Sequence, residues 1–270
     1  MSTILEVREL TKQFGGLKAV DTVSFAVEER SVFTMIGPNG AGKTTLFNLL
    51  TGLYRPTSGA IVFGGRPISG KPPHVIAKLG ISRTFQNIRL FGFLTAVDNV
   101  MIGRHSRMHA QLWDAMFRTP FARKEEREVR EKALELMRFV GIERYAEDYS
   151  RNLAYGDQRR LEIARALASD PQLILLDEPA AGLNPREKAE LGELILKIRD
   201  TGVTVFLIEH DMKVVMGISQ RIVVLDYGRK IAEGTPQEVR SNPAVIEAYL
   251  GKGAGGDTSR PHTETAEAPA

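Results

Sequence analysis

Short apolar runs alternate with segments of helical periodicity along most of the chain. Runs of Val, Ile, Leu and Phe with few polar interruptions are typical of parallel strands that are buried on both faces. Residues 31–36, 173–176, 203–208 and 222–225 form such runs, and residues 43–50 have helical character after a glycine-rich loop. Strands that alternate with helices in this way predict an α/β fold with a parallel sheet and crossover helices.

Shorter strand patterns near the N-terminus are separated by glycine turns. Residues 3–7, 23–27 and 60–63 are strand candidates, and the turns lie at residues 15–16 and 64–65. Strands that follow one another through short glycine turns favour antiparallel pairing over crossover connections. We therefore expect an antiparallel β flank beside the α/β core.

The middle of the chain has a different pattern. From about residue 98 to residue 148 the strand runs vanish and helical periodicity takes over. Gly141 stands where such a helix would stop. The residues that fall on one helical face at the 3.6-residue period are Val129, Ala133, Leu136, Met137 and Val140.

These patterns predict a single domain over residues 1–251. We interpret about residues 98–165 as a helical subdomain that is inserted into the α/β core. Residues 252–270 are rich in Gly, Thr, Pro and Ala and have no hydrophobic period. Such a composition is typical of a disordered tail.

Composition and charge narrow the classes of function. The chain has 270 residues, of which 43% are hydrophobic and 26% charged, an ordinary globular balance. Its 36 Lys and Arg exceed its 33 Asp and Glu by only three, and the two signs are interspersed, so no nucleic-acid partner is expected. The absence of cysteine excludes disulfides, thiolate metal sites and cysteine nucleophiles.

The sequence also lacks the patterns of membrane insertion. Its first residues do not have the basic-then-apolar order of a signal peptide. Its longest apolar runs, such as residues 173–176 and 205–208, are far shorter than the roughly 20 residues that cross a bilayer. A role at a membrane would therefore have to come through a partner.

The glycine-rich loop after residues 31–36 matches the pattern G-x-x-x-x-G-K-[ST] between a predicted strand and a predicted helix. Its glycines allow backbone N–H groups to turn toward a phosphate, and the following helix adds a positive dipole. A chance glycine turn before a helix is the alternative. The residues that would bind ATP here are Gly37, Pro38, Asn39, Gly40, Ala41, Gly42, Lys43, Thr44 and Thr45.

Each polar side chain of this loop has an expected role. Lys43 would reach the β- and γ-phosphates, and the Thr44 hydroxyl would ligate Mg²⁺. Two acids follow the apolar run at residues 173–176: Asp177 can hold Mg²⁺ through its water shell, and Glu178 can take a proton from the attacking water. Taken without Lys43, the pair Asp177-Glu178 could also be a solvated acidic turn after a strand.

Three further residues, in the expected order, resemble motifs of the ABC ATPase family. Phe14 matches the aromatic residue that stacks on adenine, and Gln86, in Thr84-Phe-Gln-Asn, matches the glutamine that senses Mg²⁺ and the attacking water. His210, after residues 203–208, matches the histidine that contacts the γ-phosphate. The resemblance implies catalytic roles for Gln86, Glu178 and His210, a P-loop core, and ATP and Mg²⁺ as ligands.

Residues 152–160, Asn-Leu-Ala-Tyr-Gly-Asp-Gln-Arg-Arg, match the signature segment of the same family. The resemblance implies that Ala154, Tyr155, Gly156 and Asp157 face the ATP that a second ATPase domain binds. The segment departs from the family pattern, because Ala154 replaces the usual Ser and Asp157 the usual Gln. Asn184 likewise replaces the usual Asp of a later loop.

These departures change the expected contact with phosphate. Without a serine hydroxyl, the contact would rely on the Gly156 backbone N–H and on a helix that we expect to begin near Asp157. Asp157 has the wrong charge to face a phosphate. We therefore expect its side chain to point away and to cap that helix.

Several segments narrow the resemblance to the ATPase subunits of branched-chain amino-acid importers. They are Ala154-Tyr-Gly with Arg159-Arg-Leu-Glu-Ile-Ala, Ala180-Ala-Gly-Leu-Asn-Pro, Ile208-Glu-His-Asp-Met-Lys and the ending Ala248-Tyr-Leu-Gly. The match covers nearly all of the chain before residue 252. It implies the motor subunit of an importer, whose solute could also be another amino acid, an amide or urea.

The resemblance also implies partners and a location. A second ABC ATPase subunit, or a second copy of this chain, would complete the ATP sites. Two transmembrane permease subunits would bind near Gln86 and the helical segment, and an extracytoplasmic solute-binding protein would act through them. The chain would then lie on the cytoplasmic face of the plasma membrane.

Two rival readings come from other classes. Soluble ABC proteins that act on DNA or ribosomes usually have a long coiled-coil insertion or two tandem ATPase domains, and neither pattern is present here. A small-molecule P-loop kinase would leave Gln86, Gly156 and His210 without a role.

Overall fold

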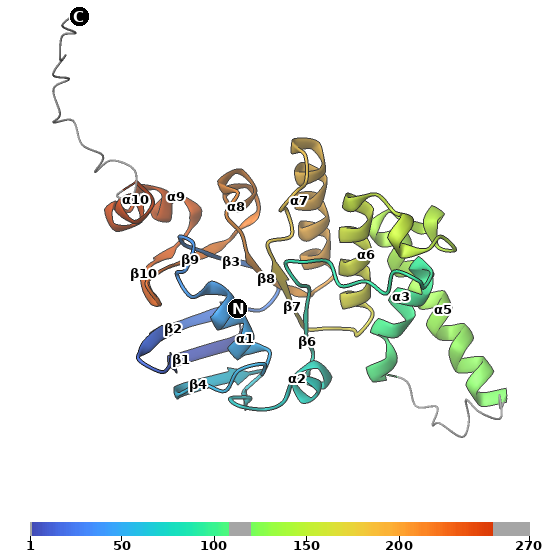
Figure 1. Cartoon of the computed structure of the whole chain (residues 1–270), viewed down its shortest axis with the longest axis horizontal. Coiled ribbons are helices and arrows are strands. Elements are labelled where there is room, and N and C mark those ends of the chain that lie inside the picture. The colour runs from blue at the N-terminus through green and yellow to red at the C-terminus, as the bar shows by residue number, and fades with distance from the viewer. Residues whose placement is uncertain (1, 108–119, 251–270) are drawn as a thin grey trace, which may run out of the picture.

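The computed structural model describes residues 2–107 and 120–250, whose strands form two sheets (Figure 1). The larger sheet has the strand order β10-β9-β3-β8-β7-β6, in which all neighbours are parallel except the antiparallel pair β9 and β10. The predicted α/β core is therefore confirmed. Its strands are β3 (Val32–Ile36), β6 (Ile81–Arg83), β7 (Leu173–Asp177), β8 (Thr204–Ile208), β9 (Arg221–Asp226) and β10 (Arg229–Gly234).

The smaller sheet is the predicted antiparallel flank, with the order β2-β1-β4-β5. Its first two strands are longer than predicted, because they form one long hairpin around the turn at residues 15–16. Leu10 and Val20 stay buried in this hairpin, but neighbouring polar residues hide the strand pattern. The strands are β1 (Thr3–Phe14), β2 (Leu17–Glu28), β4 (Ser58–Phe63) and β5 (Arg66–Pro67).

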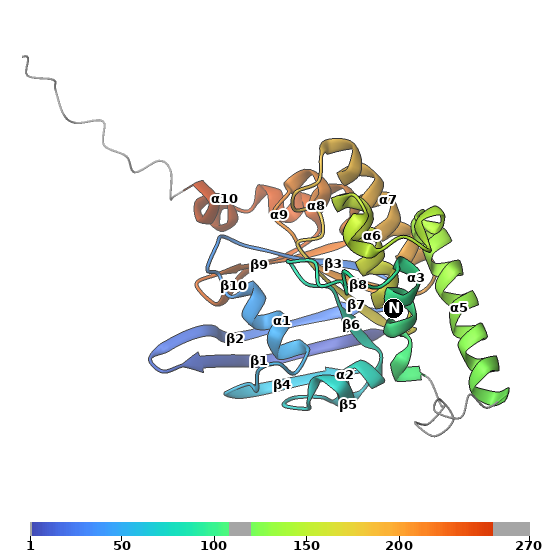
Figure 2. The same cartoon turned by 45° about the vertical axis from the view of Figure 1, so that its right-hand side comes forward.

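Helices cover the larger sheet and fill the space between the two sheets. Figure 2 shows α1 between the sheets, α7, α8 and α9 along one side of the larger sheet, and α3, α5 and α6 grouped at its end. The helices are α1 (Lys43–Leu50), α2 (Pro73–Leu79), α3 (Ala96–Gly103), α5 (Pro120–Val140), α6 (Tyr155–Leu167), α7 (Pro185–Asp200), α8 (Met212–Ile218), α9 (Pro236–Ser241) and α10 (Pro243–Leu250), with 3₁₀ turns at His105–Arg107, Glu143–Tyr145 and Ser150–Asn152.

The strands of the larger sheet are apolar throughout because both faces of the sheet are buried. In β7, Leu173 and Leu175 lie in the core between the sheets, whereas Ile174 and Leu176 lie in the core under the helices. The core between the sheets also holds a group of packed aromatic rings. These are Phe25, Phe33, Phe47 and Phe206, whose centroids lie 5.0–5.7 Å apart in four pairs.

The helical segment of the middle of the chain packs through a shared apolar face. Val97 of α3, Met137 of α5 and Ile163 of α6 belong to one buried cluster. As predicted, α5 ends at Val140, and Gly141 follows with a left-handed φ of +84°. Residues 108–119 of the expected subdomain and the expected tail at 252–270 lie outside the described residues, so the domain boundaries remain predictions.

Candidate active site

The glycine loop joins β3 to α1 and is held close to neighbouring backbone. A Cβ on Gly37 would lie 2.2 Å from the carbonyl oxygen of Leu225, and a Cβ on Gly42 would lie 2.2 Å from that of Ala19. Gly42 also has a left-handed φ of +97° directly before Lys43, the first residue of α1. Only glycine fits these two positions. The loop therefore presents backbone and the start of α1, which is the arrangement that suits a phosphate.

Lys43 points back into this loop. Its Nζ donates hydrogen bonds to the carbonyl oxygens of Gly37, at 2.7 Å, and Pro38, at 3.0 Å. Burial lowers the pKa of Lys43, and the nearby carboxylates of Glu178 and Asp177 oppose part of that shift. The ammonium group thus lies between the loop and the acid pair, where an anionic ligand would meet it.

The two acids stand at the carboxyl end of β7, next to the end of β8. Asp177 is in register with Ile208, and the N–H of Glu178 donates to the Ile208 carbonyl at 2.9 Å. Glu178 has a left-handed φ of +47°, which is unusual for a residue with a side chain. This turn directs the chain out of the sheet directly after Asp177.

Two predicted catalytic residues from distant segments, Gln86 and His210, meet the third one, Glu178. The amide Nε2 of Gln86 donates to Glu178 Oε2 at 3.1 Å, and His210 Nδ1 lies 3.6 Å from the same oxygen. Glu178 and His210 are brought together because β7 and β8 are neighbours in the sheet. The arrangement can orient a water molecule and accept its proton.

A cavity of about 780 Å³ lies between the glycine loop, Gln86 and Glu178, and neither His210 nor Asp177 lines it. Phe14 borders it at the end of β1; the residue is 42% exposed, and its ring packs edge-on against that of Tyr54 at 5.3 Å. An exposed aromatic ring at the mouth of such a cavity offers a stacking surface for a base. The predicted residues that line the cavity are Phe14, Asn39, Gly40, Ala41, Gly42, Lys43, Thr44, Thr45, Gln86 and Glu178.

The donor set suits a hard cation that also binds the ligand. Thr44, Gln86 and Asp177 offer oxygen atoms, which Mg²⁺ prefers. Within residues 2–107 and 120–250, no group of three or more His, Asp or Glu side chains is placed to hold a metal by itself. A cation here would therefore share phosphate oxygens with the chain, as is usual for Mg²⁺.

The signature segment does not border this cavity. Ala154 is the N-cap residue of α6, which begins at Tyr155, two residues before the expected start near Asp157. The predicted cap by Asp157 was wrong, because Asp157 lies in the first turn and the N-cap position makes no side-chain hydrogen bond. A Cβ added to Gly156 would point toward α7 and lie 3.0 Å from Glu187 Oε1.

Sequence reasoning missed Arg83, which contacts both the loop helix and the acid pair. Its Nη2 donates to Asp177 Oδ2 at 2.8 Å, and its Nη1 donates to Asn48 Oδ1 of α1 at 2.7 Å. Its guanidinium lies 5.6 Å from the centroid of Phe47 and 5.2 Å from that of Phe85. The available signal was only a lone arginine three residues before Gln86, after the short stretch Ile81-Ser82.

Tyr249 of α10 was also missed, because no local sequence pattern signals its position near the glycine loop. Burial raises the pKa of Tyr249 to about 12, and the nearby Gly37 backbone opposes part of that shift. The C-terminal helix therefore reaches the first residue of the glycine loop. The sequence motif Ala-Tyr-Leu-Gly marked this helix but not its contact.

Comparison with known protein families shows what the chain is similar to. A family model described as ABC transporter matches residues 20–181, and one described as branched-chain amino acid ATP-binding cassette transporter matches residues 229–255. The chain is 52% identical over 250 residues to the high-affinity branched-chain amino acid transport ATP-binding protein BraF of Pseudomonas aeruginosa, covering 92% of this chain and 98% of that one. It is 46% identical, with the same coverage, to the corresponding protein LivG of Escherichia coli.

Solved structures give the same result for the fold. A nucleotide-free ATP-binding cassette from an ABC transporter superposes with a TM-score of 0.81 at 32% identity, covering 92% of this chain and 99% of that chain. The ADP conformation of MJ1267, an ATP-binding cassette of an ABC transporter, superposes with a TM-score of 0.82 at 32% identity, covering 93% and 100%.

Proposed function

The chain belongs to the ABC transporter family of ATP-binding cassettes, and on this premise we propose that it is the ATP-hydrolysing subunit of a branched-chain amino-acid importer. The observation that supports hydrolysis is the meeting of Gln86 and His210 at Glu178, beside the glycine loop. The observation that supports the solute is the identity of 46–52% to BraF and LivG along nearly their whole length.

Each residue of the proposed site has its own role in hydrolysis. The backbone of the glycine loop and Lys43 hold the phosphates of ATP, and Phe14 stacks on the adenine. Glu178 accepts a proton from the attacking water, which Gln86 and His210 help to position. Thr44, Gln86 and Asp177 would hold Mg²⁺, which would supply positive charge to the phosphates while the γ-phosphoryl group is transferred to water and ADP leaves.

We propose that the site is completed by a second ATPase domain. Ala154, Tyr155, Gly156 and Asp157 lie outside the cavity of their own chain, so they are free to face the nucleotide of a partner. The Gly156 N–H and the start of α6 supply the contact in place of the serine hydroxyl. The partner is either a second copy of this chain or a related ATPase subunit.

The transport partners follow from the same proposal. Within residues 2–107 and 120–250, no helix is long and apolar enough to cross a membrane. Two permease subunits would supply the membrane path and bind near Gln86, where Phe91 and Phe93 are 51% and 78% exposed. An external binding protein would deliver the solute, and the chain would lie at the cytoplasmic face of the membrane.

In this proposal residues 1–251 form one ABC domain, and the helices within about residues 98–165 form its subdomain. Closure of two such domains on ATP, and reopening after hydrolysis, would move the attached permeases. The helical subdomain would carry this motion, since α6 begins with the signature segment.

A transport assay tests the function. The chain is expressed with its permease and ATPase partners, and the complex is purified in detergent and placed in vesicles with the binding protein. We expect ATP-dependent uptake of labelled leucine, and none when Glu178→Gln replaces the wild-type chain. Uptake of urea or an amide without leucine would reassign the solute, and ATP-independent uptake would overturn the proposal.

A further inference from the structure

Glu209 is a buried acid that follows β8 directly, and its side chain is fully covered. Its Oε1 accepts a hydrogen bond from the backbone N–H of Ala180 at 2.8 Å. Its Oε2 accepts from the backbone N–H groups of His210, at 2.8 Å, and Asp211, at 3.1 Å. One carboxylate therefore connects two loops that are 29 residues apart in the sequence.

Both loops carry a residue of the proposed hydrolysis site. Ala180 lies two residues after Glu178, and His210 lies directly after Glu209. The distance from His210 Nδ1 to Glu178 Oε2 is 3.6 Å, so a small relative shift of the loops would change this contact. The bonds of Glu209 thus restrain the separation between the proposed proton acceptor and the histidine.

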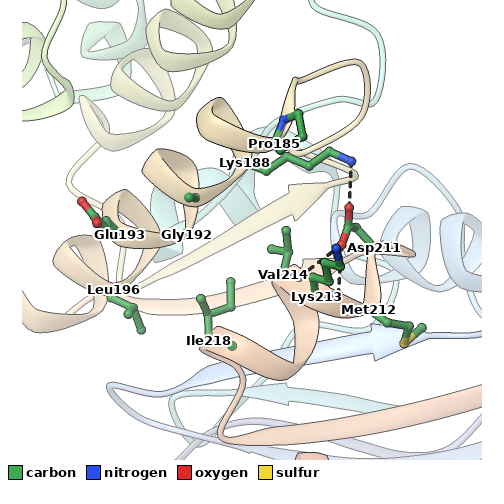
Figure 3. A pocket seen from close by; sticks show the side chains of 12 residues that line it. Pro185, Lys188, Gly192, Glu193, Leu196, Asp211, Met212, Lys213, Val214 and Ile218 are labelled. Atoms are coloured by element: carbon green, nitrogen blue, oxygen red, sulfur yellow. Dashed lines mark hydrogen bonds and ion pairs between the residues drawn. The ribbon is translucent and has the colours of Figure 1, made fainter.

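Asp211 restrains the other side of His210. Its Oδ2 pairs with Lys188 Nζ of α7 at 2.7 Å, and this hydrogen bond raises the pKa of Lys188 (Figure 3). Its Oδ1 caps α8 by accepting from the N–H groups of Lys213 and Val214. His210 is therefore flanked by two acids, each of which is tied to the segment that follows β7.

Replacing the carboxylate of Glu209 by an amide would remove at least one of its hydrogen bonds to the backbone. An ionised carboxylate only accepts hydrogen bonds, whereas one end of a glutamine amide only donates. Three N–H donors point at the two oxygens of Glu209. Glutamine would turn its NH₂ either to Ala180 or to His210 and Asp211, and one loop would lose its anchor.

We propose that Glu209 is a positioning residue for ATP hydrolysis, which holds the Glu178 loop and the His210 loop at the separation that catalysis requires. This inference rests on the proposed function of the site. It assigns a specific task to an acid that does not line the cavity. Its charge lies near two cationic or titratable groups, His210 at 3.9 Å and Lys188 on α7.

The first test measures amide hydrogen exchange in the isolated chain, which needs neither partners nor activity. In Glu209→Gln we expect faster exchange in peptides that cover residues 178–181 and 209–211. Glu238→Gln is the matched control, because Glu238 also accepts a backbone hydrogen bond, from Thr235 at 2.8 Å, but at an exposed helix start that does not line the cavity. Unchanged exchange in both peptides of Glu209→Gln would overturn the proposal.

The second test separates positioning from folding in the assembled transporter. We expect Glu209→Gln to lower kcat about tenfold while the KM for ATP changes less than about twofold. In a His210→Ala background the same substitution should have little further effect, since both act on one arrangement. Additive losses, or a rise in KM alone, would overturn the proposal. Glu209→Asp keeps both acceptor oxygens, so this variant should fold, and its kcat should fall less than that of Glu209→Gln.

A failure of the proposed function can be distinguished from a failure of the proposal for Glu209. It would leave the wild-type transporter without ATP turnover, whereas the exchange measurement on the isolated chain would still decide whether Glu209 joins the two loops.

Discussion

Arg83 Nη2 lies 2.8 Å from Asp177 Oδ2, and the two side chains are only 7% and 4% exposed. This buried ion pair fixes the carboxylate that the proposal assigns to the cation. Arg83 also bonds Asn48 on α1, so one guanidinium links the glycine-loop helix to the end of β7. The geometry of the site is therefore set partly by a residue that does not line the cavity.

Removing this arginine should destabilise the fold. Arg83→Met keeps the apolar contact with Phe47 and Phe85 but leaves Asp177 as a buried charge without its partner. We expect the free energy of unfolding to fall by about 3 kcal/mol, as measured by urea denaturation. The additional change Asp177→Asn should recover part of the loss.

An exposed arginine serves as the control for that measurement. Arg186 pairs with Glu190 at 3.0 Å, but its side chain is 89% exposed. Arg186→Met should cost less than about 1 kcal/mol. Equal losses in the two variants would show that the Arg83 pair has no special importance for stability.

Glu178→Gln should preserve ATP binding and stop hydrolysis. Glutamine keeps the size of the side chain and can still contact Gln86, but it cannot take a proton from water. Nucleotide titration and phosphate release, both on the assembled transporter, measure the two properties. Turnover within about threefold of wild type, which is a barrier change well under 1 kcal/mol, would remove Glu178 from the role of base.

Gly156→Asp should eliminate turnover, whereas Ala154→Ser should leave it unchanged or raise ATP affinity modestly. A side chain at Gly156 would meet the carboxylate of Glu187 and put negative charge where the partner's phosphate approaches. Serine at residue 154 adds a hydroxyl donor at the start of α6 with little extra volume.

Gly217→Asp in α8 is the matched control, because a Cβ there has open space. We expect its turnover to equal that of wild type. An active Gly156→Asp transporter would mean that the signature segment does not touch ATP.

Local sequence features predicted the glycine loop and the elements beside it well. The glycine loop and the helix Lys43–Leu50 were predicted with their observed bounds, because the motif, the preceding strand and the helix are contiguous in the sequence. The acids at the end of β7 were also predictable, since an apolar run marks the strand and its end.

Long-range partners were not predictable. Arg83 and Asp177 are 94 residues apart, and Glu209 and Ala180 are 29 apart, so nothing in either local pattern signals the contact. The prediction that Asp157 caps a helix failed for a local reason. Its type favours a helix cap, but Ala154 occupies the N-cap position because the helix starts earlier than its polar residues indicate.

ATP turnover by the assembled transporter that carries Lys43→Ala tests the central claim most directly. Lys43 places the positive charge nearest the glycine loop, and we expect its loss to lower turnover at least about 100-fold. Lys197→Ala, which removes an exposed lysine of α7, should leave turnover unchanged. If the Lys43→Ala transporter hydrolyses ATP at the wild-type rate, the glycine loop is not the site of hydrolysis and the account is contradicted.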